Sequence, residues 1–220
     1  MQSRTLIRDG RECCRRLRGA AMLAVFVTCV AAFSAPAQQH GESCTVMRQT
    51  GPVTILRGGR DDRSTIGTVI SADDQIVTGR NARLRLNCSG GIDATIGANS
   101  SLSVQQLTEA DQSRKAVLVL LEGILRITLA PSANRNSFEL RTPTAVAAAR
   151  STIWTTEVLP AGTSVFVVEG TVSVNSRQSG ASVLLEPGFG TDVAPNAAPT
   201  QPVRWGQARV ESALRRTEAP

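Results

Sequence analysis

The 220-residue sequence has no tyrosine, and aromatic residues make up only 3% of it. Its only histidine is His40, close to the start of the chain, and its only lysine is Lys115. So little histidine excludes a Ser-His-Asp triad in the body of the chain and leaves few metal ligands. We therefore expect no catalytic residues, no metal and no cofactor. Hydrophobic residues make up 41%, so a core must be built mainly from Val, Ile and Leu.

The formal net charge of +6 is concentrated at the N-terminus. Residues 1–37 hold six arginines against Asp9 and Glu12, which leaves only +2 for the rest of the chain. A basic balance of this kind indicates an export signal and not a nucleic-acid partner.

Residues 1–37 have the pattern of a secretory signal peptide. The apolar run from Ala20 to Phe33 is about 14 residues long, short of the roughly 20 that span a bilayer. Ala35 and Ala37 occupy the small-residue positions of a cleavage site. We predict cleavage near Ala37, a periplasmic mature protein and no stable membrane span after cleavage. An uncleaved membrane anchor is the alternative.

Cleavage would remove three of the five cysteines and leave Cys44 and Cys88. An even pair in an oxidising compartment predicts a disulfide between them. Closing a loop of about 45 residues would stabilise the fold by roughly 4 kcal/mol. Two separate buried thiols are the alternative.

The rest of the chain alternates short β-branched runs with Gly, Pro, Asn and Asp turns, which predicts an all-β fold. We expect an N-terminal segment over 38–49, one β domain over 50–193, and a Pro/Ala-rich linker and tail over 194–220. The tail is predicted to form a short helix or to be disordered. Ala145 to Ala149 is helical by propensity alone, but the run is short and Pro143 just before it favours extended backbone. The aspartate pairs 61–62 and 73–74 are interpreted as solvated turns, because neither has the spacing of a calcium loop.

A short motif recurs along the chain. Leu121-Glu122-Gly123-Ile124-Leu125-Arg126-Ile127 matches Val168-Glu169-Gly170-Thr171-Val172-Ser173-Val174, and Gly51 begins a shorter copy. A glycine inside a strand pattern marks a bend or bulge. The repeat therefore predicts a layered β fold with similar corners. Glu122 and Glu169 are interpreted as strand-end residues, although a glycosidase pair of carboxylates is the functional alternative.

The order and spacing of several motifs resemble the FecR domain of bacterial envelope regulators, from about Gly51 to Val193. The run 74–79 (DQIVTG), the run 96–102 (IGANSSL), the repeat at 121–123, and the turn 187–191 (PGFGT) contribute to the resemblance. The most specific part is 138–143 (FELRTP) followed by 147–152 (AAARST). The family has Arg-Gly-Thr where this chain has Arg150-Ser151-Thr152, so Ser151 must take another conformation or bear strain if that glycine has a positive φ.

The resemblance implies an exported, non-enzymatic domain that is sandwich-like or jelly-roll-like, with a β-solenoid-like stack as the alternative. It also implies that Gly123, Gly170, Arg150, Thr152 and Pro143 are structural corner residues. The family's regulators carry a cytoplasmic anti-sigma segment before a membrane span, and only about 19 residues precede the apolar run here. We therefore do not expect their complete signalling role.

The expected function is that of a binding module of the cell envelope for a protein or a glycan. An accessory or sensor in cell-surface signalling of the iron-uptake type is one alternative, and a carbohydrate-active enzyme is a less favoured one. The sequence does not identify the binding residues, and it leaves the oligomeric state open.

Overall fold

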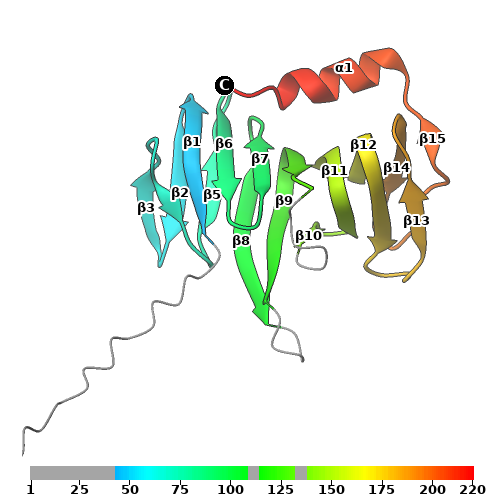
Figure 1. Ribbon diagram of the computed structural model, residues 1–220, viewed down its shortest axis with the longest axis horizontal. Coiled ribbons are helices and arrows are strands. Elements are labelled where there is room, and N and C mark those ends of the chain that lie inside the picture. The colour runs from blue at the N-terminus through cyan, green and yellow to red at the C-terminus, as the bar shows by residue number, and fades with distance from the viewer. Residues whose placement is uncertain (1–42, 109–113, 132–137) are drawn as a thin grey trace, which may run out of the picture. The chain divides into compact units, whose positions relative to one another are not determined.

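The structure is a computed structural model, and it describes residues 43–108, 114–131 and 138–220. Strands dominate these residues and one short helix lies near the C-terminus, which confirms the predicted all-β class (Figure 1). In chain order the elements are β1 (Cys44–Thr50), β2 (Val53–Arg57), β3 (Arg60–Arg63), β4 (Val69–Ile70), β5 (Gln75–Thr78), β6 (Arg83–Cys88), β7 (Ile92–Ile96), β8 (Ser101–Thr108), β9 (Arg114–Leu129), β10 (Phe138–Arg141), β11 (Ala145–Leu159), β12 (Gly162–Ser176), β13 (Ser182–Leu185), β14 (Phe189–Val193), β15 (Val203–Arg204) and α1 (Gln207–Arg216).

All these strands belong to one hydrogen-bonded sheet, and three long strands each take part in two regions of it. The first half of β9 pairs with β8 and, in parallel, with β10. Its second half, from Gly123 on, pairs with β7 and β11. The strands β11 and β12 divide in the same way, with a register shift in their pairing between Arg150 and Ile153. The sheet is therefore folded across its long strands into two layers.

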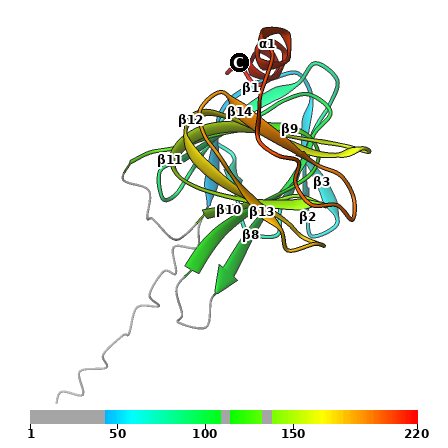
Figure 2. The same cartoon turned by 90° about the vertical axis from the view of Figure 1, so that its right-hand side faces the viewer.

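The pairing defines the members of each layer. Layer A contains β4, β1, β6, β7, the second halves of β9 and β11, the first half of β12, β14 and β15. Layer B contains β3, β2, β5, β8, the first half of β9, β10, the first half of β11, the second half of β12, and β13. Seen along the row of strands, β1, β9 and β14 lie opposite β2, β8, β10 and β13 (Figure 2). The arrangement is the sandwich-like one that the resemblance implied.

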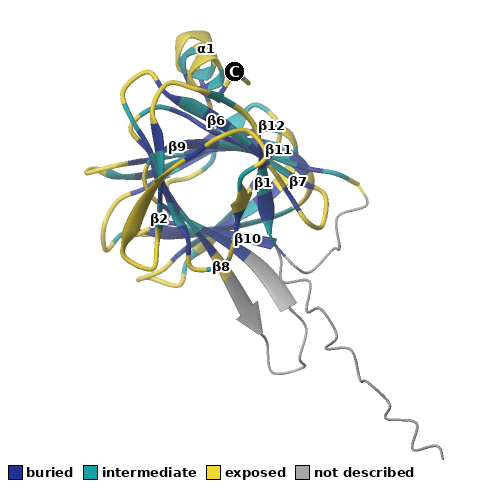
Figure 3. Cartoon of the chain, turned by 90° about the vertical axis from the view of Figure 1, so that its left-hand side faces the viewer, coloured by how far each residue is buried: buried dark blue, intermediate teal, exposed yellow. Residues whose placement is uncertain are grey.

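The core lies between the layers because alternate residues of each strand point inward. Layer A contributes Leu84, Ile127 and Trp154, while layer B contributes Ile76 and other residues that are equally inaccessible to solvent. The buried positions follow the strands and the exposed ones gather in the turns (Figure 3). Aliphatic side chains therefore form most of the core, as the aromatic-poor composition requires.

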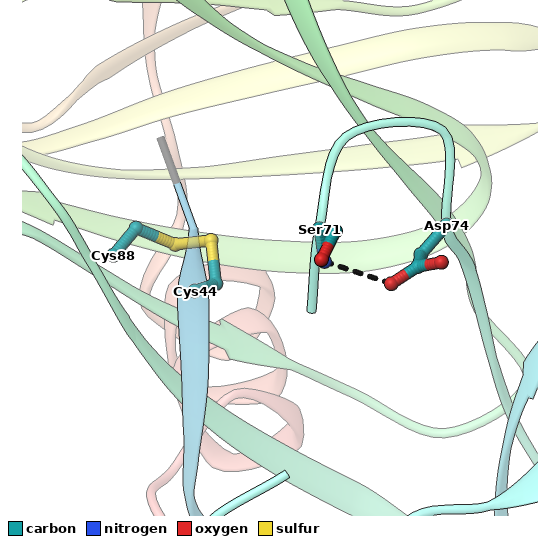
Figure 4. The surroundings of a disulfide bond; sticks show 4 residues. All are labelled: Cys44, Ser71, Asp74 and Cys88. Atoms are coloured by element: carbon teal, nitrogen blue, oxygen red, sulfur yellow. Dashed lines mark hydrogen bonds between the residues drawn. A yellow bond between two sulfur atoms is a disulfide. The ribbon is translucent and has the colours of Figure 1, made fainter. Parts of the chain in front are cut away.

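A disulfide joins Cys44 to Cys88, the pair predicted from the sequence (Figure 4). The two residues are direct cross-strand partners in β1 and β6, and both side chains are buried. The bond therefore ties the first strand of layer A to its neighbour. The described sheet extends beyond residues 50–193, since it begins with β1 at Cys44 and includes β15.

Asp74 is buried, so its interpretation as part of a solvated turn is wrong. Its carboxylate accepts two hydrogen bonds from the Arg57 guanidinium, at 2.8 and 2.6 Å. It also accepts one from the backbone N–H of Ser71 at 2.7 Å (Figure 4). The hydrogen bond from Arg57 is the main cause that lowers the pKa of Asp74 below its ordinary value, against the opposing effect of burial. Asp74 thus fixes the turn before β5 as a buried carboxylate.

The helix α1 packs on the outer side of layer A through a small apolar cluster of its own. Trp205 stacks on Phe166 with ring centroids 4.8 Å apart, and Ala213 and Ile124 complete the buried part of the cluster. The Arg209 guanidinium lies 3.6 Å from the centre of the Trp205 ring and pairs with Asp192 at 2.7 Å. The tail predicted as helical or disordered is thus a helix that covers part of the sheet.

The predicted signal peptide, its cleavage site and His40 lie outside the described residues. Within residues 43–108, 114–131 and 138–220, no helix is both long and apolar enough to cross a membrane.

Candidate functional site

The two long copies of the repeat each contain a corner of the folded sheet. Gly123 in β9 has φ +91° and Gly170 in β12 has φ +80°, values that only glycine adopts without strain. A Cβ added at Gly123 would lie 2.5 Å from the Cα of Ser100, and one at Gly170 would lie 2.6 Å from the Thr152 hydroxyl. Both positions therefore need glycine for its backbone conformation and for its lack of a side chain.

The corners lie at opposite ends of the second half of β11. Val158 pairs with Gly123 at one end, and Ile153 pairs with Thr128 at the other, just after Arg150 to Thr152. Of the five predicted corner residues, Gly123 and Pro143 lie at the first corner, where both line the same pocket. Gly170, Arg150 and Thr152 lie together at the second corner.

At the second corner β11 and β12 stay paired on both sides of the bend, and the Thr152 hydroxyl contacts both strands. The Thr152 hydroxyl lies 2.5 Å from the carbonyl oxygen of Arg150 and 3.1 Å from that of Thr171. Ser151 has φ +45°, so the serine that replaces the family's glycine does adopt a left-handed conformation. Arg150 is exposed here and has a partner of its own.

The first corner opens into a pocket of about 820 Å³. Its walls are the bend of β9, the β11–β12 hairpin, and the turns that precede β6, β8 and β11. The charged and the main apolar residues of the lining are Arg83, Leu121, Glu122, Pro143, Glu157, Leu159, Pro160 and Arg216. A pocket of this volume falls in the range of small-molecule and peptide sites.

Two leucines give the pocket an apolar character. Leu121 is 44% exposed and Leu159 is 53% exposed, both well above what a core leucine shows. They lie on neighbouring strands, since the pairing of β9 with β11 ends at Gly123 and Val158. Pro143 and Pro160 add further apolar surface without adding a backbone N–H. An exposed apolar cluster in a concave surface is typical of a binding site.

An ion pair lies at one side of the pocket. The Arg216 guanidinium, at the end of α1, donates to both carboxylate oxygens of Glu157, at 2.5 and 2.8 Å. This bidentate pair raises the pKa of Arg216 above its ordinary value. Glu122 also lines the pocket, and no ion pair involves it among the described residues.

A cluster of buried threonines adjoins the pocket, and two of them, Thr144 and Thr163, line it. The Thr163 hydroxyl lies 2.8 Å from that of Thr142 and 2.7 Å from that of Thr144. The Thr142 hydroxyl also accepts a hydrogen bond from the backbone N–H of Ala145 at 2.9 Å. These contacts fix the turn that carries Pro143 against the β11–β12 hairpin. A second cavity, of about 200 Å³, shares Leu159, Gly162 and Thr163 with the pocket and extends it toward β14.

Sequence reasoning identified the bend at Gly123 but not the pocket. It predicted no binding residues, and it did not single out Leu121, Glu157, Leu159 or Arg216. The only feature in the sequence that could have indicated the pocket was the position of Leu121 and Leu159 next to turn residues. Arg216 gave no signal at all, since it comes from the tail. Glu169, the suggested glycosidase partner of Glu122, pairs with Ile153 at the second corner and does not line the pocket.

Among the described residues no three His, Cys, Asp or Glu side chains are grouped closely enough to hold a metal ion.

Fold and pocket together define an all-β domain with a concave surface at one corner. The sequence profile of the family described as FecR protein matches residues 74–173, which confirms the resemblance that the motifs predict over this stretch. The match begins at Asp74 and includes both glycine corners.

The fold is also similar to solved structures. Two crystal structures of a candidate anti-sigma factor from Parabacteroides distasonis match it, with TM-scores of 0.52 and 0.51 and sequence identities of 15% and 17%. The first alignment covers 64% of this chain and 64% of that one, and the second covers 64% and 63%. At these identities the likeness shows the fold alone. No curated protein sequence matches this chain.

Proposed function

We propose that this protein is a non-enzymatic binding module of the bacterial cell envelope, with a signalling-related role, and that it binds a protein segment in the pocket at the Gly123 corner. The observation that carries the proposal is the pocket of about 820 Å³ with Leu121 and Leu159 exposed in it. Their exposure contrasts with a core whose leucines are almost wholly inaccessible. The signalling-related part of the proposal rests on the FecR domain and on the fold of the candidate anti-sigma factor.

The lining favours a protein segment over a glycan. Among the described residues that line the pocket, none is aromatic, while two leucines and three prolines are present. Apolar pockets of this kind receive apolar side chains from extended segments. The suggested glycosidase pair of Glu122 and Glu169 is not brought together either, since Glu169 lies at the second corner and does not line the pocket.

We further propose that the protein acts in the periplasm after cleavage near Ala37. The disulfide between buried Cys44 and Cys88 supports an oxidising compartment. N-terminal sequencing of protein recovered from the periplasmic fraction should begin near Gln38. Recovery of a full-length chain in the membrane fraction would favour the uncleaved anchor.

Site-specific photocrosslinking tests the pocket. The photoreactive amino acid p-benzoylphenylalanine is placed at Leu159 in the pocket or at Leu184, which is 62% exposed on β13 and does not line it. We expect irradiated cells to give a protease-sensitive adduct from position 159 and none from position 184. Adducts of equal yield from both positions, or none from position 159, would contradict the proposal.

The identity of the adduct distinguishes the remaining alternatives. An outer-membrane transporter or an inner-membrane regulator would favour an accessory or sensor in cell-surface signalling. An adduct that resists protease and yields to glycosidase would favour a glycan ligand.

A further inference from the structure

The pocket is partly occupied by a side chain of the C-terminal helix, Arg216. Arg216 reaches in from the last turn of α1 and forms a two-point contact with the Glu157 carboxylate. The Glu157 side chain is 19% exposed and the Arg216 side chain 44% exposed. Glu157 is therefore the less accessible, fixed partner, held near the end of β11, and Arg216 is the more accessible one. A planar guanidinium on a carboxylate is also how a protein recognises arginine in another chain.

The charges of the lining are arranged around this contact. Ile124 is the cross-strand partner of Glu157, and Glu122 precedes it by two residues on β9. Glu122 and Glu157 both line the pocket, on either side of the bend at Gly123, since Glu122 pairs with Ser101 of β8 before the bend and Glu157 pairs with Ile124 after it. If Arg216 left, two carboxylates would face the cavity there, with Leu121 and Leu159 beside them. Arg83, which lines the pocket from β6, supplies a donor for a carbonyl or carboxylate group.

Arg216 is carried by a short helix that packs on the sheet through a small cluster. The helix α1 has ten residues, too few to be stable without packing, and its N-cap, Gly206, makes no side-chain hydrogen bond. Its apolar packing is the small cluster around Trp205, which is separate from the main core, and its ion pairs with the sheet are Arg209–Asp192 and Arg216–Glu157. Thr217, just after the helix, is buried. The last turn contributes Ala213 to that cluster, while Arg215 pairs only with Glu211 on the same helix. Release of the last turn therefore leaves the sheet intact.

We propose that Arg216 occupies the place of a basic side chain of the partner, and that the pocket recognises an extended protein segment in which an arginine or lysine is flanked by apolar residues. The partner's basic residue displaces Arg216 from Glu157, its apolar neighbours contact Leu121 and Leu159, and the last turn of α1 is freed. Binding is thereby coupled to the position of the C-terminal helix. This inference rests on the proposed function, since it names the partner chemistry of the same pocket.

Two small peptides test the proposal on the purified protein. The probes are N-acetyl-Leu-Arg-Leu-amide and its glutamine counterpart, N-acetyl-Leu-Gln-Leu-amide, and affinity is measured from NMR chemical shifts. The variant Arg216→Gln removes the internal competitor. We expect it to bind the arginine probe about threefold tighter than the unmodified protein, or more, since an accessible ion pair contributes up to about 1 kcal/mol. The glutamine probe should bind both proteins equally weakly.

Two further variants separate competition from nonspecific effects. Arg215→Gln removes an equal charge from the same turn but leaves the pair with Glu157, so it should bind the arginine probe as the unmodified protein does. Glu157→Gln, combined with Arg216→Gln, should abolish the preference for arginine over glutamine. The backbone spectrum of each variant reports directly whether the sheet is intact. In the unmodified protein, a saturating arginine probe should raise hydrogen exchange in residues 213–216 and not in β11.

Equal affinity of the arginine probe for the unmodified protein and the Arg216→Gln variant would overturn the proposal. So would equal binding of the two probes to that variant, or no binding to it at all. If crosslinking from position 159 succeeds while the probes fail, the pocket binds a protein segment by another chemistry. If the crosslinking fails as well, the proposed function itself is wrong.

Discussion

The corner at Gly123 and the corner at Gly170 have the same local motif and different surroundings. In each, a glycine with positive φ packs against a hydroxyl residue, Ser100 or Thr152, that follows another residue of positive φ. At the first corner the strands β9 and β11 part beyond Gly123, and a pocket opens. At the second, β11 and β12 remain paired on both sides of the bend. The motif therefore determines where the sheet bends, whereas the pairing of the neighbouring strands determines whether the bend leaves a cavity.

The glycines themselves should show the largest effect. Gly123→Ala and Gly170→Ala each force a side chain into a left-handed backbone and a close contact, so each should lower the free energy of unfolding by roughly 3 kcal/mol or more. Gly58→Ala is the matched control, because Gly58 has φ +54° but open space around it. It should cost only about 1 kcal/mol in urea denaturation. A cost at Gly170 no larger than at Gly58 would show that the two corners are not equivalent.

A buried carboxylate outside both corners should control stability in acid. Because the folded-state pKa of Asp74 is lowered, its contribution is complete above the unfolded pKa of about 4 and is lost as the pH falls through the folded-state value. Asp74→Asn should cost about 2 kcal/mol at pH 7 and flatten the acid part of the stability curve. The glycine variants should lower the curve by the same amount at every pH. An unchanged acid limb in Asp74→Asn would contradict this assignment.

The hydroxyls of Ser100 and Thr152 should contribute differently to the free energy of unfolding. The Ser100 hydroxyl accepts the buried backbone N–H of Ile124 at 3.0 Å, whereas the Thr152 hydroxyl contacts only carbonyl oxygens. An unpaired N–H is tolerated less well than a carbonyl. We expect Ser100→Ala to cost about 1.5 kcal/mol and Thr152→Val about 0.5 kcal/mol in thermal and chemical unfolding. The reverse order would show that the closed corner depends more on its hydroxyl than the open one.

Replacing the strained serine should have the smallest effect, and a stabilising one. Ser151 is an exposed residue with φ +45°, so Ser151→Gly should raise the free energy of unfolding by about 0.5 kcal/mol, after the greater freedom of the unfolded chain is included. The equivalent change at the first corner, Asn99→Gly, should be near neutral because asparagine tolerates this conformation. Differential scanning calorimetry of both variants measures the difference. A destabilised Ser151→Gly variant would show that the serine side chain has a role here.

Local chemistry explains what the sequence could predict. The all-β class, the pairing of Cys44 with Cys88 and the bends at Gly123 and Gly170 all depend on residue types within a few positions or on a count of cysteines. The strand from Ala145 was harder to delimit. Its alanines have little strand preference, and they are extended because β10 and β12 pair with them on both sides.

The pocket could not be predicted because its parts meet only through the pairing of distant strands. Glu157 and Arg216 are 59 positions apart, and nothing near either residue indicates the other. Asp74 was misinterpreted for the same reason, since its partner, Arg57, lies on a strand 17 positions earlier. A charged residue can be predicted as exposed only when no residue of opposite charge, distant in the sequence, pairs with it in the fold.

The sharing of β9, β11 and β12 between the layers has a consequence for how this protein comes apart. If the two layers had separate strands, one layer could unfold while the other stayed folded, and a protease could then cleave that partly unfolded intermediate. Here, unfolding of any one of the three shared strands breaks backbone hydrogen bonds in both layers at once. Denaturation should accordingly be a single all-or-none event for residues 44–193, and cleavage at the turns should leave the fragments associated until the whole sheet is lost.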